Sequence, residues 1–311
     1  MKKIAVLLMG PTGAGKSELA LRLVERLPLE IVSVDSAMIY KRMDIGTAKP
    51  APEVLARVPH HLIDLLDPAQ SYSAGEFLRD AQDAMNGIWS RGRHPLLVGG
   101  TMLYFHALTQ GIAELPQSNP AIRADIEARA AAEGWVSLHE ELARVDADAA
   151  ARIHVNDPQR IQRALEVFRI TGEPITRLQR ARAPRLSGVE VIEYALAPVE
   201  RAHLHASIER RFELMMQAGF LAEVSRLYER GDLSPAHPSM RCVGYRQLWQ
   251  HLAGAYGLQA ATEKGIAATR QLAKRQWTWL RRRPLVTWVD PWQPGLAKDV
   301  ISALSMRIAN S

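Results

Sequence analysis

The feature that most constrains the fold of this chain is an apolar run that leads directly into a glycine-rich loop. The run IAVLLM (residues 4–9) is followed by GPTGAGKS (residues 10–17), which fits the pattern G-x-x-x-x-G-K-[ST]. In this pattern a buried strand delivers the loop to the start of a helix, and backbone N–H groups of the loop surround phosphate oxygens. The chain is therefore expected to contain a parallel sheet with a phosphate site at its edge.

Strand and helix patterns alternate through the first third of the chain. Strands are predicted at residues 3–9, 30–34 and 95–100, and helices at residues 16–27 and 73–90. The second helix begins with a capping box formed by Ser73 and Glu76. This alternation predicts an α/β fold, with a P-loop NTPase-like parallel sheet flanked by helices.

Between residues 111 and 188 the strand patterns disappear. Two helices are predicted to begin where Asn or Asp precedes a proline, at Asn119-Pro120 and Asp157-Pro158, and to end near Gly134 and Gly172. We predict an all-helical insertion domain over residues 111–188, with the core divided between residues 1–110 and 189–311. The second part of the core is expected to contain strands at residues 189–198 and 285–289 and helical patterns at residues 202–229 and 264–281.

The bulk composition predicts a globular protein, and its basic balance is by itself only weak evidence for a nucleic-acid partner. Of the 311 residues 47% are hydrophobic, enough for a large core, and the net charge is +6 with a pI of about 9.6. Excess cationic charge is typical of proteins that neutralise nucleic-acid phosphates. Cys242 is the only cysteine, so no internal disulfide can form and a reducing compartment is favoured. No run approaches the ~20 apolar residues that span a bilayer, and we expect a cytoplasmic protein with no membrane partner.

The loop residues suit phosphate binding by their chemistry. The glycines let the backbone approach phosphates closely, Lys16 is placed to contact the terminal phosphate, and Ser17 is placed to hold Mg²⁺. The pattern alone leaves the ligand open between a nucleoside triphosphate and another di- or triphosphate bound with a metal ion. The predicted phosphate-binding residues are Gly10, Pro11, Thr12, Gly13, Ala14, Gly15, Lys16 and Ser17.

Polar residues that follow the other two strands are candidates for the chemistry. Asp35, in SVDS, could act in catalysis, bind a metal ion or cap a turn. Thr101 follows Gly99-Gly100 and could donate its hydroxyl into a pocket, cap the next helix, or do both. Because these residues and the loop all follow strands of one sheet, we expect them to share one pocket. Asp64 could bind a metal ion or occupy a turn, and His60-His61 is interpreted as a structural or surface pair.

Basic residues gather in three segments downstream of the loop: DPQRIQRALEV, MRCVGYR and TRQLAKRQWTWLRRR. A run of charge is usually a solvated surface and tryptophan is usually core, yet three clusters after a phosphate loop indicate a long anionic partner. In the second segment, Tyr245 could stack on a base. The residues concerned are Gln159, Arg160, Arg163, Arg241, Arg246, Arg270, Lys274, Arg275 and Arg281.

Taken in order, the motifs resemble those of the bacterial tRNA dimethylallyltransferases (tRNA isopentenyltransferases) over essentially the whole chain. The loop reads GAGKS where that family often has ASGKT, a change that keeps the lysine and a hydroxyl. Met38 stands where some relatives carry glutamine, a departure that leaves open whether this position makes a polar contact to the target base. The matching segments are GPTGAGKS, SVDSAMIYKRMDIGTAKP, HHLIDLLDP, YSAGEF, LLVGGTMLYF, NDPQRIQRALEV, RFELMMQAGFLAEV, RCVGYRQLW and ATRQLAKRQWTWLR.

The resemblance implies that the loop holds the diphosphate of dimethylallyl pyrophosphate with Mg²⁺ as cofactor. It implies transfer of the dimethylallyl group to N6 of the adenine just 3′ of the anticodon, in tRNAs that read codons beginning with U. Asp35 is then the general base, Thr101 and Lys16 are catalytic, and Arg211 joins the diphosphate site. The implied tRNA contacts are Asp35, Ser36, Ala37, Met38, Thr101, Arg123, Gln159, Arg160, Ile161, Gln162, Arg163, Arg241, Cys242, Val243, Gly244, Tyr245, Arg246, Lys274 and Arg275.

Three other functions stay open at this stage. A kinase-like enzyme would use the same loop for ATP, an adenylate isopentenyltransferase would modify a free nucleotide, and a nucleic-acid-binding ATPase would transfer no group at all. The distributed arginines and the order of the downstream motifs favour a tRNA transferase over the kinase, and the helical insertion favours RNA over a free nucleotide. The protein is expected to act as a monomer.

Overall fold

The alternating patterns produce one six-stranded sheet in the computed structural model, which describes residues 2–113, 115–180, 184 and 186–309. All strand pairs in this sheet are parallel, and the strand order is β3-β2-β4-β1-β5-β6. This confirms the predicted α/β class with a parallel sheet. The strands are β1 Ile4–Met9, β2 Leu29–Val34, β3 His60–His61, β4 His94–Gly99, β5 Glu190–Leu196 and β6 Thr287–Val289.

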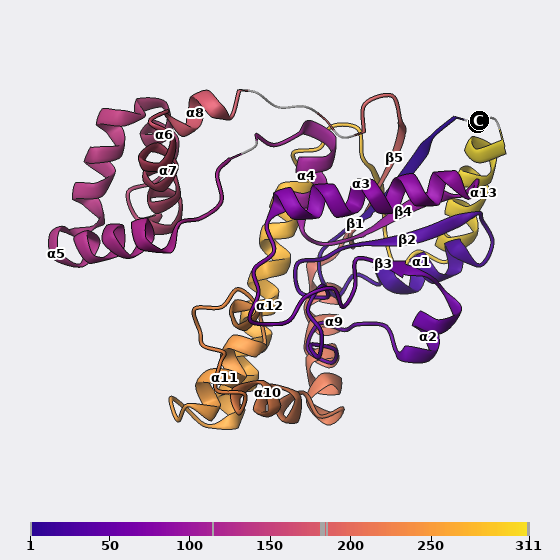
Figure 1. Cartoon of the computed structure of the whole chain (residues 1–311). Coiled ribbons are helices and arrows are strands. Elements are labelled where there is room, and N and C mark those ends of the chain that lie inside the picture. Colours follow the sequence, from indigo (N-terminus) through magenta and orange to yellow (C-terminus); the bar gives the residue numbers. More distant parts are fainter. Residues whose placement is uncertain (1, 114, 181–183, 185, 310–311) are drawn as a thin grey trace. The chain divides into compact units, whose positions relative to one another are not determined.

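The chain divides into two compact units (Figure 1). The core unit contains Met1–His106 and Leu186–Ser311, and the helical unit contains Ala107–Arg185. The sequence had placed the corresponding boundaries after residues 110 and 188. Helices of the core unit are α1 Lys16–Val24, α2 Pro52–Arg57, α3 Ala74–Ser90, α9 Arg201–Gln217, α10 Phe220–Tyr228, the short 3₁₀ helix Ser239–Arg241, α11 Tyr245–Leu252, α12 Leu258–Leu280 and α13 Leu296–Ala309, while α4 Met102–Gln110 crosses the boundary.

Helices cover both faces of the sheet, as a parallel sheet requires. Strand β1 lies at its centre, and all six of its residues are fully buried. Alternate β1 side chains pack with α1 and with Leu296, Val300 and Leu304 of α13, while α3 lies along the other face (Figure 1). Helix α3 begins with the predicted capping box, in which the Ser73 side chain accepts the Glu76 N–H.

The helical unit has a hydrophobic core of its own. Ile126 and Leu142 of α5 pack with Ile161 and Leu165 of α7. Helix α5 is interrupted at Gly134, whose φ of 82° is disfavoured for residues with a side chain, so the predicted break falls there. The helices of this unit are α5 Pro120–Val145, α6 Ala147–Arg152, α7 Pro158–Thr171 and α8 Ile175–Leu178.

Two expectations about helices were wrong in detail. The pattern over residues 202–229 forms two helices, α9 and α10, because Gly219 adopts a φ of 96° between them. The first helix ends at Val24, three residues before the predicted end at Leu27. Within the part of the chain that the structure describes, no helix combines the length and apolar character needed to cross a lipid bilayer.

Candidate active site

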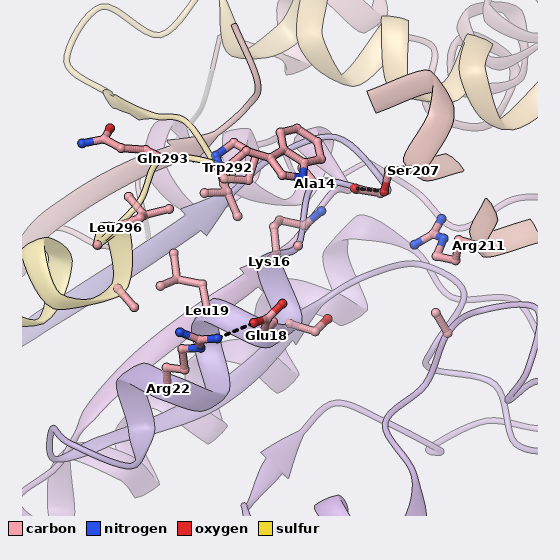
Figure 2. Close-up of a pocket in the computed structure, with 18 of the residues that line it drawn as sticks. Ala14, Lys16, Glu18, Leu19, Arg22, Ser207, Arg211, Trp292, Gln293 and Leu296 are labelled. Carbon is pink, nitrogen blue, oxygen red and sulfur yellow. Dashed lines mark hydrogen bonds and ion pairs between the residues drawn. The ribbon is translucent and has the colours of Figure 1, made fainter. Parts of the chain in front are cut away.

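The phosphate loop joins β1 to α1 in the way the sequence motif predicts. Gly13 and Gly15 have φ values of 84° and 76°, in the left-handed region that favours glycine. These two residues turn the backbone so that α1 begins directly at Lys16, where the positive end of the helix dipole faces the loop. The loop is also held from outside, because the Ser207 hydroxyl of α9 donates to the Gly13 carbonyl at 2.8 Å (Figure 2).

Two cations meet at this loop. The Lys16 ammonium donates to the Pro11 carbonyl at 2.8 Å, and the Arg211 guanidinium of α9 donates to the Thr12 hydroxyl. Burial and the positive charge of Arg211 lower the pKa of Lys16 to about 7, while the Asp35 carboxylate acts in the opposite direction. Burial also lowers the pKa of Arg211, again against Asp35. Neither cation has a carboxylate within ion-pair distance among the described residues, so an anion at the loop would be favoured by both.

A cleft of about 700 Å³ opens beside the loop. Lys16 and Arg211 line it together with Trp292 and Gln293, which precede α13, and Leu296, the first residue of α13 (Figure 2). Sequence reasoning missed these last three residues, because no motif connects them with a loop at the other end of the chain. We call this space the loop cleft.

A smaller cavity of about 100 Å³ lies next to the loop, and we call it the Asp35 cavity. It brings together Lys16, Ser17 and Asp35, which the sequence assigned to one pocket, and adds Arg211. Thr101, which was expected in the same pocket, does not line this cavity, although Gly99 does. The remaining wall is mostly apolar and includes Ala20, Ile31, Met38, Ile63 and Val98. The arrangement combines cations, one carboxylate and a small apolar space.

Asp35 and Thr101 lie at the ends of neighbouring strands, β2 and β4. One oxygen of the Asp35 carboxylate, Oδ1, accepts the N–H groups of Ala37 at 2.8 Å and Met38 at 3.3 Å, so Asp35 does cap a turn. Its other oxygen, Oδ2, accepts no hydrogen bond from a described residue. The Thr101 hydroxyl accepts the Ser36 N–H at 3.1 Å. The turn therefore fixes the carboxyl group and leaves one oxygen able to accept a proton.

The structure contains a residue that the sequence analysis did not identify, Gln276 of α12. Its side chain is buried, with 9% exposed, and it bonds to both the phosphate loop and the end of β4. A glutamine at this place has no motif signature, because 264 residues separate it from its partner Thr12.

The candidate RNA-binding residues of the helical unit have mixed environments. Arg160 is exposed and pairs with Asp157 at 2.8 Å, whereas Ile161 is fully buried in the core of the unit. An RNA contact by the Ile161 side chain is therefore excluded in this structure. Arg123 and Arg163 both bind the carboxylate of Glu166, at 2.9 and 2.6 Å. Gln162 donates to Glu127 at 2.9 Å.

Glu166 orients two of these predicted RNA contacts. Its side chain is fully buried, and it accepts the Asn119 N–H at 2.8 Å as well as the two guanidinium groups. These hydrogen bonds hold the pKa of Glu166 below its usual range, against the opposing effect of burial. Arg123 and Arg163 are thus held in fixed orientations and keep part of their surface exposed.

The segment from Arg241 to Arg246 differs from expectation at one position. Arg241 and Arg246 are exposed, as are Lys274 and Arg275 on α12. Tyr245, by contrast, is fully buried, and its hydroxyl donates to Glu223 at 2.6 Å. The prediction that this ring stacks on a base is wrong for this structure, because the ring is packed inside the protein. Its role is to anchor the segment.

Cys242, in the same segment, lies within electrostatic range of Asp35. Burial raises the pKa of the Cys242 thiol to about 12, and the Asp35 carboxylate adds to the increase. The segment predicted to bind RNA therefore approaches the carboxylate predicted to take a proton. Ser36, Ala37 and Val243 are at least partly accessible beside it, and Gly244 is buried.

The remaining candidates from the sequence, Asp64 and the pair His60-His61, each bond to a neighbouring group of the protein. Asp64 binds the Lys49 ammonium at 2.6 Å, and Lys49 also binds Asp44. His60 bonds to the Val58 carbonyl, while His61 bonds to Glu30 at 3.0 Å. Across the described residues no group of three or more His, Cys, Asp or Glu side chains could hold a metal ion. This environment supports the turn interpretation of Asp64 and a structural role for His61, whereas His60 also lines the Asp35 cavity.

The loop nevertheless fits a magnesium ion that is bound together with a phosphate ligand. Mg²⁺ prefers oxygen ligands and usually keeps several waters, with only one or two protein groups and substrate phosphates completing its shell. Ser17 is exposed at the start of α1 and lines both cavities, and Asp35 lines one of them. These hard oxygen donors suit the ion.

Fold and site together define a P-loop enzyme whose loop faces a small cavity with a carboxylate. Residues 38–283 match the family model described as IPP transferase. The structure is similar to that of a tRNA isopentenylpyrophosphate transferase from Bacillus halodurans, with 33% identity, 99% of this chain and 98% of that chain covered, and a TM-score of 0.71. A second similar structure is a tRNA isopentenylpyrophosphate transferase from Staphylococcus epidermidis, with 29% identity, full coverage of both chains and a TM-score of 0.69.

A eukaryotic dimethylallyltransferase acting on tRNA shares the fold, with a TM-score of 0.85 at 24% identity over 99% of this chain and 80% of that one. The chain therefore belongs to the IPP transferase family of tRNA prenyltransferases. The resemblance inferred from the motifs is confirmed.

Proposed function

We propose that this protein transfers the dimethylallyl group of dimethylallyl pyrophosphate to N6 of the adenine just 3′ of the anticodon. The products are N6-isopentenyladenosine in the tRNA and diphosphate, and the substrates are tRNAs that read codons beginning with U. One observation carries the proposal: the two cations of the loop and the Asp35 carboxylate line the same small, largely apolar cavity. A phosphate ligand, an apolar group and a proton acceptor can therefore meet there.

The diphosphate is assigned to the loop residues Gly10 to Ser17. As the carbon–oxygen bond breaks, negative charge develops on the leaving oxygen, and charges aimed at that oxygen stabilise the transition state. Lys16, Arg211 and the loop amides supply this charge. When bound through Ser17, Mg²⁺ adds a further positive charge on the diphosphate oxygens.

The dimethylallyl group is assigned to the Asp35 cavity. A cavity of 150 Å³ lined by apolar side chains holds benzene, which has six carbons. At about 100 Å³ the Asp35 cavity is of the size that suits a group of five carbons. Its wall of Ala20, Ile31 and Val98 is apolar, so the prenyl chain gains stabilisation by leaving water there.

Asp35 is the proposed general base. The N6 nitrogen attacks the carbon that carries the diphosphate, a C–N bond forms as the C–O bond breaks, and one N6 proton passes to the Asp35 carboxylate. Two backbone N–H groups hold Oδ1 of that carboxylate, so Oδ2 is the acceptor. Thr101, fixed against Ser36 at the neighbouring strand end, positions the acceptor base.

The acceptor is the anticodon arm of a tRNA. An adenine must leave its stack to enter a cavity of this kind, at a cost of a few kcal/mol. Phosphate contacts from the exposed residues Arg241, Arg246, Lys274 and Arg275 would offset that cost. These residues belong to the same unit as the loop, and Cys242, which follows Arg241, lies within electrostatic range of Asp35.

The test compares the wild-type protein with Asp35→Asn, which keeps the size and the turn geometry of the side chain. With dimethylallyl pyrophosphate and an unmodified anticodon stem-loop, we expect turnover to fall by about 10²–10⁴-fold in the variant, while stem-loop affinity is retained. A near-wild-type rate would remove Asp35 from its role. Parallel reactions with AMP as acceptor, and with ATP and no prenyl donor, separate this function from a free-nucleotide transferase and from a kinase or ATPase.

A further inference from the structure

Gln276 is the only described side chain that hydrogen-bonds to both the phosphate loop and the segment leading to Thr101. We propose that Gln276 is a positioning residue, which fixes the leaving-group site against the acceptor site. This inference rests on the proposed function and deepens it. Gln276 itself need contact neither substrate.

The contacts come from the two ends of one amide group. Gln276 Oε1 accepts the backbone N–H of Thr12 at 2.8 Å, and Gln276 Nε2 donates to the Gly100 carbonyl at 2.9 Å. Because one partner can only donate and the other can only accept, the orientation of the amide is fixed by its partners. A buried amide with both ends satisfied therefore joins the two segments.

Each partner is adjacent to a residue with a proposed role. Thr12 bonds through its hydroxyl to Arg211, one of the two cations at the loop. Gly100 precedes Thr101, whose hydroxyl holds the Ser36 N–H beside Asp35. A shift of Gln276 would therefore change the distance between the diphosphate and the attacking nitrogen. A misplacement of about 1 Å in a reacting pair can cost about 10²-fold in rate.

The surroundings leave little room for another geometry. A Cβ at Gly100 would lie 2.3 Å from Gln276 Nε2, so a glycine is needed for this close approach. One turn earlier on α12, Ala273 packs with Ala14 of the loop. Helix α12 therefore contacts the loop along one face, while Lys274 and Arg275 on the same helix are exposed. An RNA held by these two cations would bind to the helix that sets the loop geometry.

The first experiment uses Gln276→Met, which has similar length but makes neither hydrogen bond. We expect inorganic pyrophosphate with Mg²⁺ to bind about tenfold more weakly in calorimetry, because the loop loses its support. The single-turnover transfer rate with saturating substrates should fall by about 10²-fold. The affinity for the anticodon stem-loop should stay within about twofold of wild type, since the exposed cations are unchanged.

Thr269→Val is the matched control. Thr269 is also buried on α12, but its hydroxyl bonds only to Gly265 within the helix. The control should lose some thermal stability and keep both pyrophosphate affinity and transfer rate within about twofold of wild type. If Gln276→Met and Thr269→Val behave alike, Gln276 is merely structural and the proposal is overturned.

A double-mutant cycle with Gly100→Ala tests the contact itself. The added methyl group should displace the Gln276 amide and weaken pyrophosphate binding, and combining it with Gln276→Met should add little further loss. Fully additive losses would overturn the proposal, as would unchanged pyrophosphate affinity in Gln276→Met. If Gln276→Met binds pyrophosphate as tightly as the wild type but binds the stem-loop more weakly, Gln276 contacts the RNA and the proposal is overturned. Because pyrophosphate binding needs no transfer reaction, these outcomes stand even if the wild-type protein modifies no RNA.

Discussion

Glu223 of α10 forms the most densely bonded carboxyl group of the core unit's described residues, and its replacement gives a quantitative test of the structure. Its Oε2 accepts the backbone N–H groups of Asp44 at 2.9 Å and Ile45 at 2.8 Å. Its Oε1 accepts the Gly46 N–H at 3.1 Å and the Tyr245 hydroxyl at 2.6 Å. The side chains of Glu223 and Tyr245 are buried, whereas Asp44 is exposed and Ile45 and Gly46 are partly buried. Glu223 thereby connects residues 44–46 to Tyr245, in the segment that we predict to bind RNA.

Glu223→Gln keeps the size of the side chain but turns one oxygen into an NH₂ group. Each carboxylate oxygen accepts two of the four donors, so in either orientation of the amide the new NH₂ group faces two N–H or O–H groups that have lost their acceptor. Each buried donor left without its acceptor costs about 1–3 kcal/mol, so we expect the free energy of unfolding to fall by about 3–5 kcal/mol. Tyr245→Phe removes only one of the four bonds and should cost roughly half as much. A loss of 3–5 kcal/mol is a large part of the about 5–15 kcal/mol that stabilises a typical domain.

The assay is urea-induced unfolding followed by circular dichroism, with the midpoint and the slope m compared among the three proteins. An unchanged m value would show that the compactness of the folded and unfolded states is preserved. The reasoning is refuted if Glu223→Gln unfolds within about 1 kcal/mol of wild type, or if Tyr245→Phe costs as much as Glu223→Gln. Either result would mean that water, or a rearranged loop, satisfies these donors.

Three further predictions concern the substrate sites. Because the pKa of Lys16 is lowered to about 7, pyrophosphate binding above that pH requires Lys16 to take up a proton, and the affinity should fall by up to about tenfold per pH unit. In Lys16→Met only the ligand titrates, so calorimetry should show that this pH dependence is lost. Equal slopes of log affinity against pH in the two proteins would contradict the prediction. Arg241→Ala should lower the slope of log affinity for the stem-loop against log salt by about one unit, and an unchanged slope would exclude a phosphate contact. Glu166→Gln should weaken stem-loop binding, because Arg123 and Arg163 are released from their fixed orientations. The measurement is stem-loop affinity at constant salt. Tighter binding would show that Glu166 holds these arginines away from the RNA.

Local signals in the sequence predicted much of the core unit. The loop motif after an apolar run placed β1, the phosphate loop and α1, and the capping box at Ser73 placed the start of α3. The rule that ligands lie at the carboxyl ends of parallel strands correctly brought Asp35 and the loop to one cavity. Each of these inferences depends on residues close together in the chain, or on the geometry of the sheet as a whole.

What the sequence could not show are contacts between distant segments. Gln276 accepts a hydrogen bond from Thr12, 264 residues away in the chain, and Glu223 accepts one from Asp44, 179 residues away. A glutamine or glutamate within a helical pattern gives no indication of a partner so distant in the sequence. The misjudged Tyr245 has the same cause. Arginines on either side suggested an exposed ring, whereas Glu223 and Phe220, which lie elsewhere in the chain, bury it. Burial of a polar aromatic side chain depends on which segment supplies its hydrogen-bond partner, and periodicity does not encode that.

In the proposed reaction, the phosphate loop holds the leaving group of a prenyl donor while Asp35 takes a proton from an adenine amine. The most direct measurement is mass spectrometry of an unmodified anticodon stem-loop after incubation with purified protein, Mg²⁺ and dimethylallyl pyrophosphate. We predict a product in which one five-carbon prenyl group replaces one hydrogen on the adenine 3′ of the anticodon, and no product when that adenine is replaced by guanine. An RNA of unchanged mass with the wild-type protein would show that the protein does not catalyse this transfer.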